Sequence, residues 1–173
     1  IMLLWLFKYI NPETYMKSLI LYTYPIFGCF FIIAIPYSYE KYEPVLIFLI
    51  YAINWINNSF AYIIGKNFGK NKLLKNISPN KSWEGFFGGM LFSLLFSLAY
   101  YKLQTEINFT KLFFLSFSIP VLATLGDLVQ SKIKREAGAK DSGNLLPGHG
   151  GFFDRMDSII FVAPWSYFVL NQL

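Results

Sequence analysis

The sequence predicts an all-α integral membrane protein that crosses the lipid bilayer several times. Of its 173 residues, 55% are hydrophobic and only 14% are charged, whereas a soluble domain carries about 25% charged residues. Aromatic residues make up 20% of the chain, and 19 of them are phenylalanine. This composition is typical of a chain whose surroundings are mostly lipid.

Five runs of apolar residues are candidates for membrane-spanning helices, because about 20 helical residues cover the hydrocarbon core of a bilayer. The runs occupy residues 18–37, 44–64, 84–101, 111–130 and 158–173. Tyrosine and tryptophan gather near their ends, as in the aromatic belts at membrane surfaces. We therefore expect a polytopic helical bundle with about five spans, forming a single domain over residues 1–173.

Basic residues are concentrated in two of the connections between these runs. Residues 65–83 contain five lysines and no acidic residue, and residues 131–155 contain five basic residues. Two spans separate the connections, so both lie on the same side of the membrane. With Lys8 and Lys17, 12 basic residues lie on that side and 3 on the other. The positive-inside rule then predicts an inner (cytoplasmic) membrane protein whose two basic loops face the cytoplasm. The same rule explains the net charge of +5 without a nucleic-acid partner.

The connection at residues 65–83 has features of a phosphate-binding segment. Two glycines, Gly65 and Gly69, are each followed by lysine, so backbone and ammonium groups can both approach a phosphate closely. Ser82 directly precedes the third apolar run, and a serine-capped helix start is a natural anion site. Gly85 would let a ligand come near. The alternative is an ordinary basic loop with a capped helix. The candidate substrate contacts in this segment are Lys66, Lys70, Ser78, Lys81 and Ser82.

The segment at residues 126–158 interleaves carboxylates with cations. Asp127 lies at the end of an apolar run, where an ionised group is costly and indicates function. Asp127 and Ser131 share a helix face, and so do Asp154 and Asp157 if the last helix begins near Phe153. Carboxylate oxygens suit Mg²⁺, which keeps waters and substrate phosphates in its shell, while lysine and arginine neutralise phosphate. The alternative is a set of surface salt bridges that cap two helices.

Residues of both basic connections form one recognisable sequence pattern. The positions in the second connection are Ser131, Lys134, Arg135, Lys140, Asp141, Ser142, Gly143, Pro147, Gly148, His149, Gly150, Gly151, Asp154, Arg155 and Asp157. Those before it are Phe60-Ala61-Tyr62, Gly65-Lys66, Gly69-Lys70 and Ser78-Pro79-x-Lys81-Ser82. Together they resemble the CDP-diacylglycerol synthases, also called phosphatidate cytidylyltransferases, over residues 54–165.

The resemblance implies a Mg²⁺-dependent enzyme that converts CTP and phosphatidic acid to CDP-diacylglycerol and pyrophosphate in phospholipid biosynthesis. Members of that family usually have further N-terminal spans, so we expect additional helices before residue 1. They also usually have aspartate where this chain has Asn58, and asparagine keeps an acceptor oxygen but carries no charge. The implied metal ligands are Asp127 and Asp154, with Asp141 and Asp157 close by.

The remaining roles follow from the same comparison. Segment 65–83 would hold phosphate, while Asp127, Asp141 and Asp154 would place the metal. The candidate catalytic residues are Asp127, Asp154, Lys134, Arg135 and Lys140. The candidate substrate contacts in the second connection are Ser131, His149 and Arg155.

The expected partners are CTP, phosphatidic acid and the lipid bilayer. A homodimer and a second, monovalent cation are left open, as are acyl-chain preference and the choice between CTP and dCTP. Three alternatives to this function are a CTP-dependent lipid kinase, a membrane transporter and an inactive relative. A transporter would place charges facing each other within the spans, whereas these charges gather at the span ends.

Overall fold

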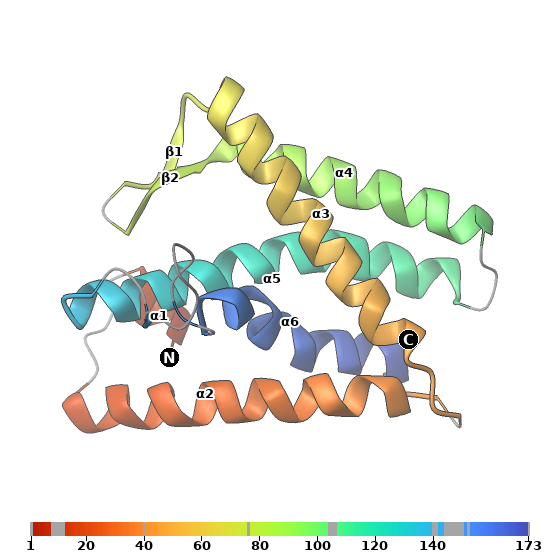
Figure 1. Cartoon of the computed structure of the whole chain (residues 1–173), viewed down its shortest axis with the longest axis horizontal. Coiled ribbons are helices and arrows are strands. Elements are labelled where there is room, and N and C mark those ends of the chain that lie inside the picture. The colour runs from red at the N-terminus through yellow and green to blue at the C-terminus, as the bar shows by residue number, and fades with distance from the viewer. Residues whose placement is uncertain are drawn as a thin grey trace.

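The computed structural model describes residues 2–7, 13–39, 41–75, 77–103, 107–139, 142–143, 151 and 153–172 (Figure 1). Helices dominate it, so the predicted all-α bundle is confirmed, with one small two-stranded sheet added. In chain order the elements are α1 (Met2–Leu6), α2 (Thr14–Ala34), the short 3-10 helix η1 (Ile35–Tyr37), α3 (Val45–Phe68), β1 (Lys72–Leu74), β2 (Ser78–Ser82), α4 (Trp83–Leu103), α5 (Phe109–Glu136) and α6 (Phe153–Gln172).

Four segments are long and apolar enough to cross a membrane, judged by length and composition. They are Tyr15–Tyr37, Val45–Phe68, Trp83–Leu103 and Phe109–Glu136, which correspond to the first four predicted spans. The fifth predicted span coincides with α6, a helix of 20 residues that does not qualify within the described part of the chain. Asp154 and Asp157 near its start and Asn171 and Gln172 at its end leave an apolar stretch shorter than a bilayer requires.

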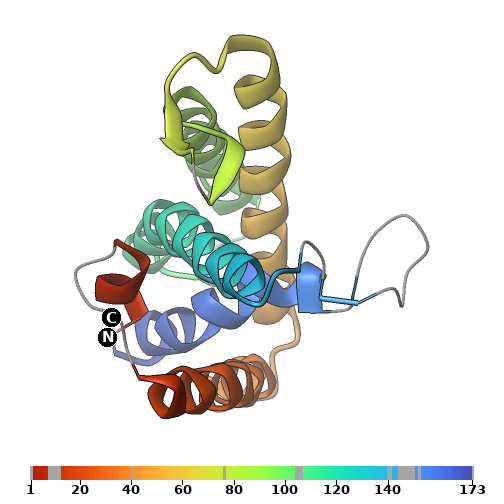
Figure 2. The same ribbon diagram turned by 90° about the vertical axis from the view of Figure 1, so that its left-hand side faces the viewer.

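The helices form two packed groups that share α5 (Figures 1 and 2). α2 lies against α6, and α6 packs along α5, while α3 and α4 pack against each other and α4 also contacts α5. The β1–β2 hairpin, the end of α5 and the start of α6 all lie at one end of the bundle (Figure 1). The two basic connections therefore share that end, as predicted.

Glycines allow α4 to approach α3 closely. A Cβ atom at Gly89 would lie 2.6 Å from the backbone oxygen of Asn57, and one at Gly85 would lie 2.6 Å from that of Ala61. Small residues at such interfaces let two helix backbones come together. α3 thus fills the space on one side of Gly85, while the residue also lines the polar pocket described below.

The hairpin that joins α3 to α4 was not predicted from the sequence. Its strands pair antiparallel, with Lys72 opposite Ser82 and Leu74 opposite Ser78. They have three and five residues, Lys-Leu-Leu and Ser-Pro-Asn-Lys-Ser, and show no alternation of apolar and polar residues that would predict a strand. The hairpin is tied to α4 by Asn71, whose Nδ2 donates to Glu84 Oε1 at 2.8 Å.

A buried polar contact fixes the start of α6 against α3. Asn54 Nδ2 donates to Ser158 Oγ at 3.0 Å, and both side chains are buried. From α2, the Tyr24 hydroxyl donates to the backbone oxygen of Asp157 at 2.9 Å. Helices from both groups therefore hold the first turns of α6, where two of the candidate carboxylates lie.

Candidate active site

A polar pocket of about 360 Å³ lies where the hairpin meets α3, α4, α5 and α6. Three carboxylates line it: Asp127 from α5, and Asp154 and Asp157 from α6. The opposite wall comes from β2 and the helix ends beside it. The wall residues with polar side chains are Asn58, Tyr62, Ser78, Asn80, Lys81 and Ser82. The two connections singled out in the sequence therefore contribute to one pocket.

An ion pair between Lys81 and Asp127 joins the two walls. Lys81 Nζ contacts Asp127 Oδ2, and both side chains keep part of their surface open to solvent. The other oxygen, Oδ1, accepts a hydrogen bond from Ser131 Oγ at 3.3 Å, one helical turn along α5. Ser82 Oγ accepts from the backbone N–H of Gly85 at 3.2 Å, so it caps α4 as predicted. A lysine from β2 and a carboxylate from α5 thus meet inside the pocket.

Asp154 is held by donors from three separate places in the chain. Its Oδ1 accepts from Lys134 Nζ at 2.7 Å. Its Oδ2 accepts from the backbone N–H and the hydroxyl of Ser142, at 2.8 and 2.9 Å, and from the N–H of Gly151 at 2.9 Å. Burial alone would raise the pKa of Asp154, but these donors outweigh it and hold the pKa well below its usual range. Asp154 therefore stays ionised and ties α5 to both Ser142 and Gly151.

The surroundings of Asp157 raise its pKa, whereas those of Asp154 lower it. Burial and the nearby Asp127 carboxylate raise the pKa of Asp157 from 3.8 to about 7. Its Oδ1 accepts the N–H of Ser158 at 2.6 Å, which only partly offsets those effects. The Asp127 carboxylate therefore disfavours ionisation of Asp157, and a cation bound beside the two would relieve that repulsion.

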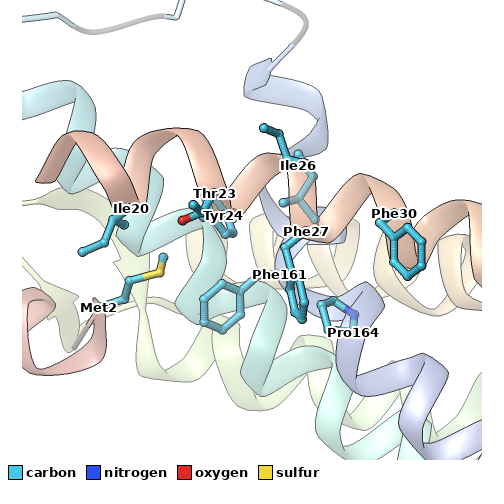
Figure 3. Close-up of a pocket in the computed structure, with 10 residues that line it drawn as sticks. Met2, Ile20, Thr23, Tyr24, Ile26, Phe27, Phe30, Phe161 and Pro164 are labelled. Carbon is cyan, nitrogen blue, oxygen red and sulfur yellow. The ribbon is translucent and has the colours of Figure 1, made fainter. Parts of the chain in front are cut away.

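A larger cavity of about 790 Å³ lies between α1, α2 and α6 (Figure 3). Its walls include Phe27, Phe30, Phe161 and Pro164, whose side chains lie between α2 and α6 in the close-up. None of the described residues that line it is charged. A triphosphate needs cations or metal ligands around it, so the smaller polar pocket is the better candidate for chemistry despite its size.

Comparisons with known proteins identify the family of the chain. The sequence model of the cytidylyltransferase family matches residues 1–173. This chain belongs to that family. It is 43% identical over 132 residues to the phosphatidate cytidylyltransferase of Bacillus subtilis, a match that covers 76% of this chain and 49% of that protein. Two others, from Staphylococcus epidermidis and Staphylococcus aureus, are 43% identical over 139 residues, or 79% of this chain and 54% of theirs. The chain thus spans about half the length of these relatives, and the resemblance inferred from its motifs is confirmed.

The carboxylates of this cytidylyltransferase-family chain fit a divalent metal as a pair rather than as a larger cluster. Within the described ranges, no three Asp, Glu, His or Cys side chains are grouped closely enough to hold an ion. Asp127 and Asp157 interact directly through their charges, whereas Asp154 already accepts four hydrogen bonds. Mg²⁺ commonly binds through one or two carboxylates and fills its shell with water and substrate phosphates. Asp127 and Asp157 meet that requirement.

The other candidate residues of this family member divide between the pocket and its surroundings. Ser78, Lys81 and Ser82 line the pocket, and Ser131 and Lys134 contact its carboxylates. Four candidates are not among the described lining residues: Lys66, Lys70, Arg135 and Arg155. Three candidates lie outside the described residues: Lys140, Asp141 and His149.

The positions of two of these outlying cations can be stated. Lys66 Nζ lies 5.8 Å from the centre of the Tyr62 ring. Arg135 Nη1 donates to the backbone oxygen of Ala139 at 3.3 Å, on the exposed side of α5.

Sequence reasoning missed several residues that shape the pocket. Asn80 and Thr124 line it, and Ser142 anchors Asp154. Asn80 and Ser142 both lie inside the motifs quoted above, so position within a motif was the available signal. Thr124 carried none, because a threonine in an apolar helix is ordinary. It lies three residues before Asp127, on the same face of α5.

Proposed function

We propose that this protein transfers the cytidylyl group of CTP to phosphatidic acid, giving CDP-diacylglycerol and pyrophosphate. The observation that carries the proposal is the pocket in which Lys81 and three carboxylates converge at one end of the membrane helices. Two similar proteins that are named for this reaction share 43% of their aligned residues with the chain, which supports it.

The chemistry requires charge neutralisation more than proton transfer. The phosphate of phosphatidic acid is a monoester whose second pKa is about 6, by analogy with phosphorylated side chains. Its oxygen is therefore already anionic near neutral pH and can attack the α-phosphorus of CTP without a strong general base. The bond from that phosphorus to the bridging oxygen breaks as pyrophosphate leaves. The main barrier is the repulsion between two polyanions.

The residues of the pocket are suited to lowering that barrier. Asp127 and Asp157 would hold Mg²⁺, which supplies positive charge to the phosphate oxygens when it is bound. Lys81 is close enough to exchange the Asp127 carboxylate for a phosphate oxygen. Ser82, which lines the pocket, caps the start of α4, so the positive end of that helix dipole lies beside the same space. Each contributes electrostatic stabilisation that is already oriented before the reaction.

The position of the pocket suits an amphipathic lipid substrate. The acyl chains of phosphatidic acid would remain in the bilayer while its head group enters the pocket. Both basic connections lie at this end of the bundle (Figure 1), which supports the proposal that the reaction takes place on the cytoplasmic face of the inner membrane.

The test is to incubate the purified protein with phosphatidic acid, CTP labelled in its α-phosphate, and Mg²⁺. Labelled CDP-lipid with release of pyrophosphate is the expected result. Release of CDP with an unlabelled lipid product would instead indicate transfer of the γ-phosphoryl group, as in a lipid kinase.

Two variants test the assigned carboxylates. Asp127→Asn and Asp157→Asn should each reduce turnover about 100-fold or more, because each removes a carboxylate that would hold the Mg²⁺ needed to neutralise the phosphates. Glu136→Gln is a matched control, since Glu136 also lies on α5 but pairs with Lys17 outside the pocket. Near-normal turnover in both aspartate variants would refute the assignment.

A further inference from the structure

Four exposed lysines lie in the last turn of α3 and in the connection from α3 to α4. They are Lys66, Lys70, Lys72 and Lys75, and none of them is among the described residues that line the pocket. The salt bridges formed by the described residues include Lys81 but none of these four. Lys66 Nζ lies 5.8 Å from the centre of the ring of Tyr62, which lines the pocket, so the charges that the described pocket does not account for are those of Lys70, Lys72 and Lys75.

The acidic residue nearest to them in sequence is already engaged. Glu84 accepts hydrogen bonds from the backbone N–H and the side chain of Asn71, at 3.2 and 2.8 Å, and so holds the hairpin against α4. Residues 65–83 contain no acid of their own. The hairpin thus presents a group of cations whose mutual repulsion the described contacts do not relieve.

Exposed aromatic side chains lie beside these lysines. Phe68 ends α3, and Trp83 and Phe87 lie on the first turns of α4, with their ring centres 6.0 Å apart. All three are largely exposed, at 67%, 47% and 59%. Aromatic rings flanked by lysine are typical of the zone where a protein crosses from lipid to water.

The hairpin cannot move away from that zone. α3 ends at Phe68 and α4 begins at Trp83, and both helices are candidate membrane spans. The strands between them are short and paired, and Asn71 is tied to α4. With α3 and α4 crossing the membrane as these candidate spans indicate, the lysines would lie at the level of the lipid head groups.

We propose that Lys70, Lys72 and Lys75, together with Phe68, Trp83 and Phe87, form a docking surface for anionic phospholipid head groups, which we call the hairpin surface. Its partner is the negatively charged leaflet around the protein, and it is separate from the pocket that would bind CTP. The attraction of lysines near a membrane surface to anionic lipid makes this partner the one that matches the charge. The proposal does not depend on the proposed reaction, because the lipid that tests it need not be a substrate.

The test uses the whole chain, purified in a neutral detergent and titrated with phosphatidylglycerol, which is anionic, or with phosphatidylcholine, which has no net charge. Native mass spectrometry gives the number of retained lipids and the apparent affinity. The unmodified protein should bind phosphatidylglycerol more tightly than phosphatidylcholine. The double variant Lys72→Gln/Lys75→Gln should weaken phosphatidylglycerol binding by about five-fold for each lysine removed. Lys72→Arg/Lys75→Arg keeps the charges and should restore binding.

The matched control is Lys41→Gln/Lys102→Gln, which removes the same charge from two exposed lysines at the other end of the bundle. This variant should bind phosphatidylglycerol as the unmodified protein does. Equal affinity for the two lipids would overturn the proposal, as would equal losses in both glutamine variants. A preference for inorganic phosphate over phosphatidylglycerol would show a free-anion site and would overturn it too. Circular dichroism of each variant establishes that the comparison is made between folded proteins.

Discussion

The ion pair between Lys134 and Asp154 should contribute far more stability than the ion pair between Lys17 and Glu136 on the same helix. The first pair is 2.7 Å apart, and its side chains are only 17% and 12% exposed. The second is 3.0 Å apart, with side chains 33% and 37% exposed. Water and salt screen the second pair, so its coupling energy should be below about 1 kcal/mol.

The larger value for the first pair follows from the bonds that Asp154 accepts. Asp154→Asn would keep its oxygen toward Ser142 and Gly151, which supply three of the four donors, and would turn its amide group toward the Lys134 ammonium. A largely buried lysine would then face a donor instead of an anion. Removing one partner of such a pair costs about 3 kcal/mol or more.

A double-mutant cycle isolates this interaction. The single variants Lys134→Gln and Asp154→Asn and their double variant would be unfolded thermally in detergent, beside the same cycle on Lys17→Gln and Glu136→Gln. We expect a coupling energy of about 2–3 kcal/mol for the first cycle. Equal coupling in the two cycles, or additive effects at Lys134 and Asp154, would refute the view that Asp154 is a structural anchor of the pocket.

Three further predictions concern the pocket and the helices around it. The raised pKa of Asp157 means that, without metal, the folded protein retains a proton that the unfolded chain has lost between about pH 4 and pH 7. The melting temperature should therefore fall as pH rises through this range. Asp157→Asn should flatten that decline. Gly89→Val should separate α3 from α4, because even a Cβ atom would lie 2.6 Å from the Asn57 oxygen, and should lower the melting temperature while Leu91→Val, at an exposed position of α4, changes it little. Asn58→Asp adds a carboxylate to the pocket wall and should lower the Mg²⁺ concentration needed for half-maximal turnover; a higher requirement would count against a metal beside residue 58.

The parts of the site that depend on local geometry could be predicted from the sequence. Asp127 and Ser131 lie four residues apart on one helix, so their contact follows from helical periodicity. The cap that Ser82 forms on α4 likewise requires only its position before the first helical turn. The division of the chain into apolar spans also follows directly from the composition of each segment.

The parts of the site that depend on contacts between distant segments could not be predicted from the sequence. Lys66, Lys70 and Lys81 are alike in sequence, but the pairing of β1 with β2 directs only Lys81 toward Asp127. The strands are short and show no alternation of apolar and polar residues, so the sequence offered no means of choosing among the lysines. Similarly, nothing local indicates that Ser142 would donate to a carboxylate twelve residues later.

The sequence by itself determined that this is a membrane-embedded helical protein of the cytidylyltransferase family, because hydropathy and a fixed spacing of charged residues are properties of the linear chain. The tertiary structure alone decided how those charges are used. It made Asp154 an anchor with a lowered pKa and Asp157 a buried neighbour of Asp127 with a raised one, although the two lie three residues apart. The physical reason is that the pKa of a carboxylate depends on the donors, charges and solvent around it in space, which the order of residues does not specify.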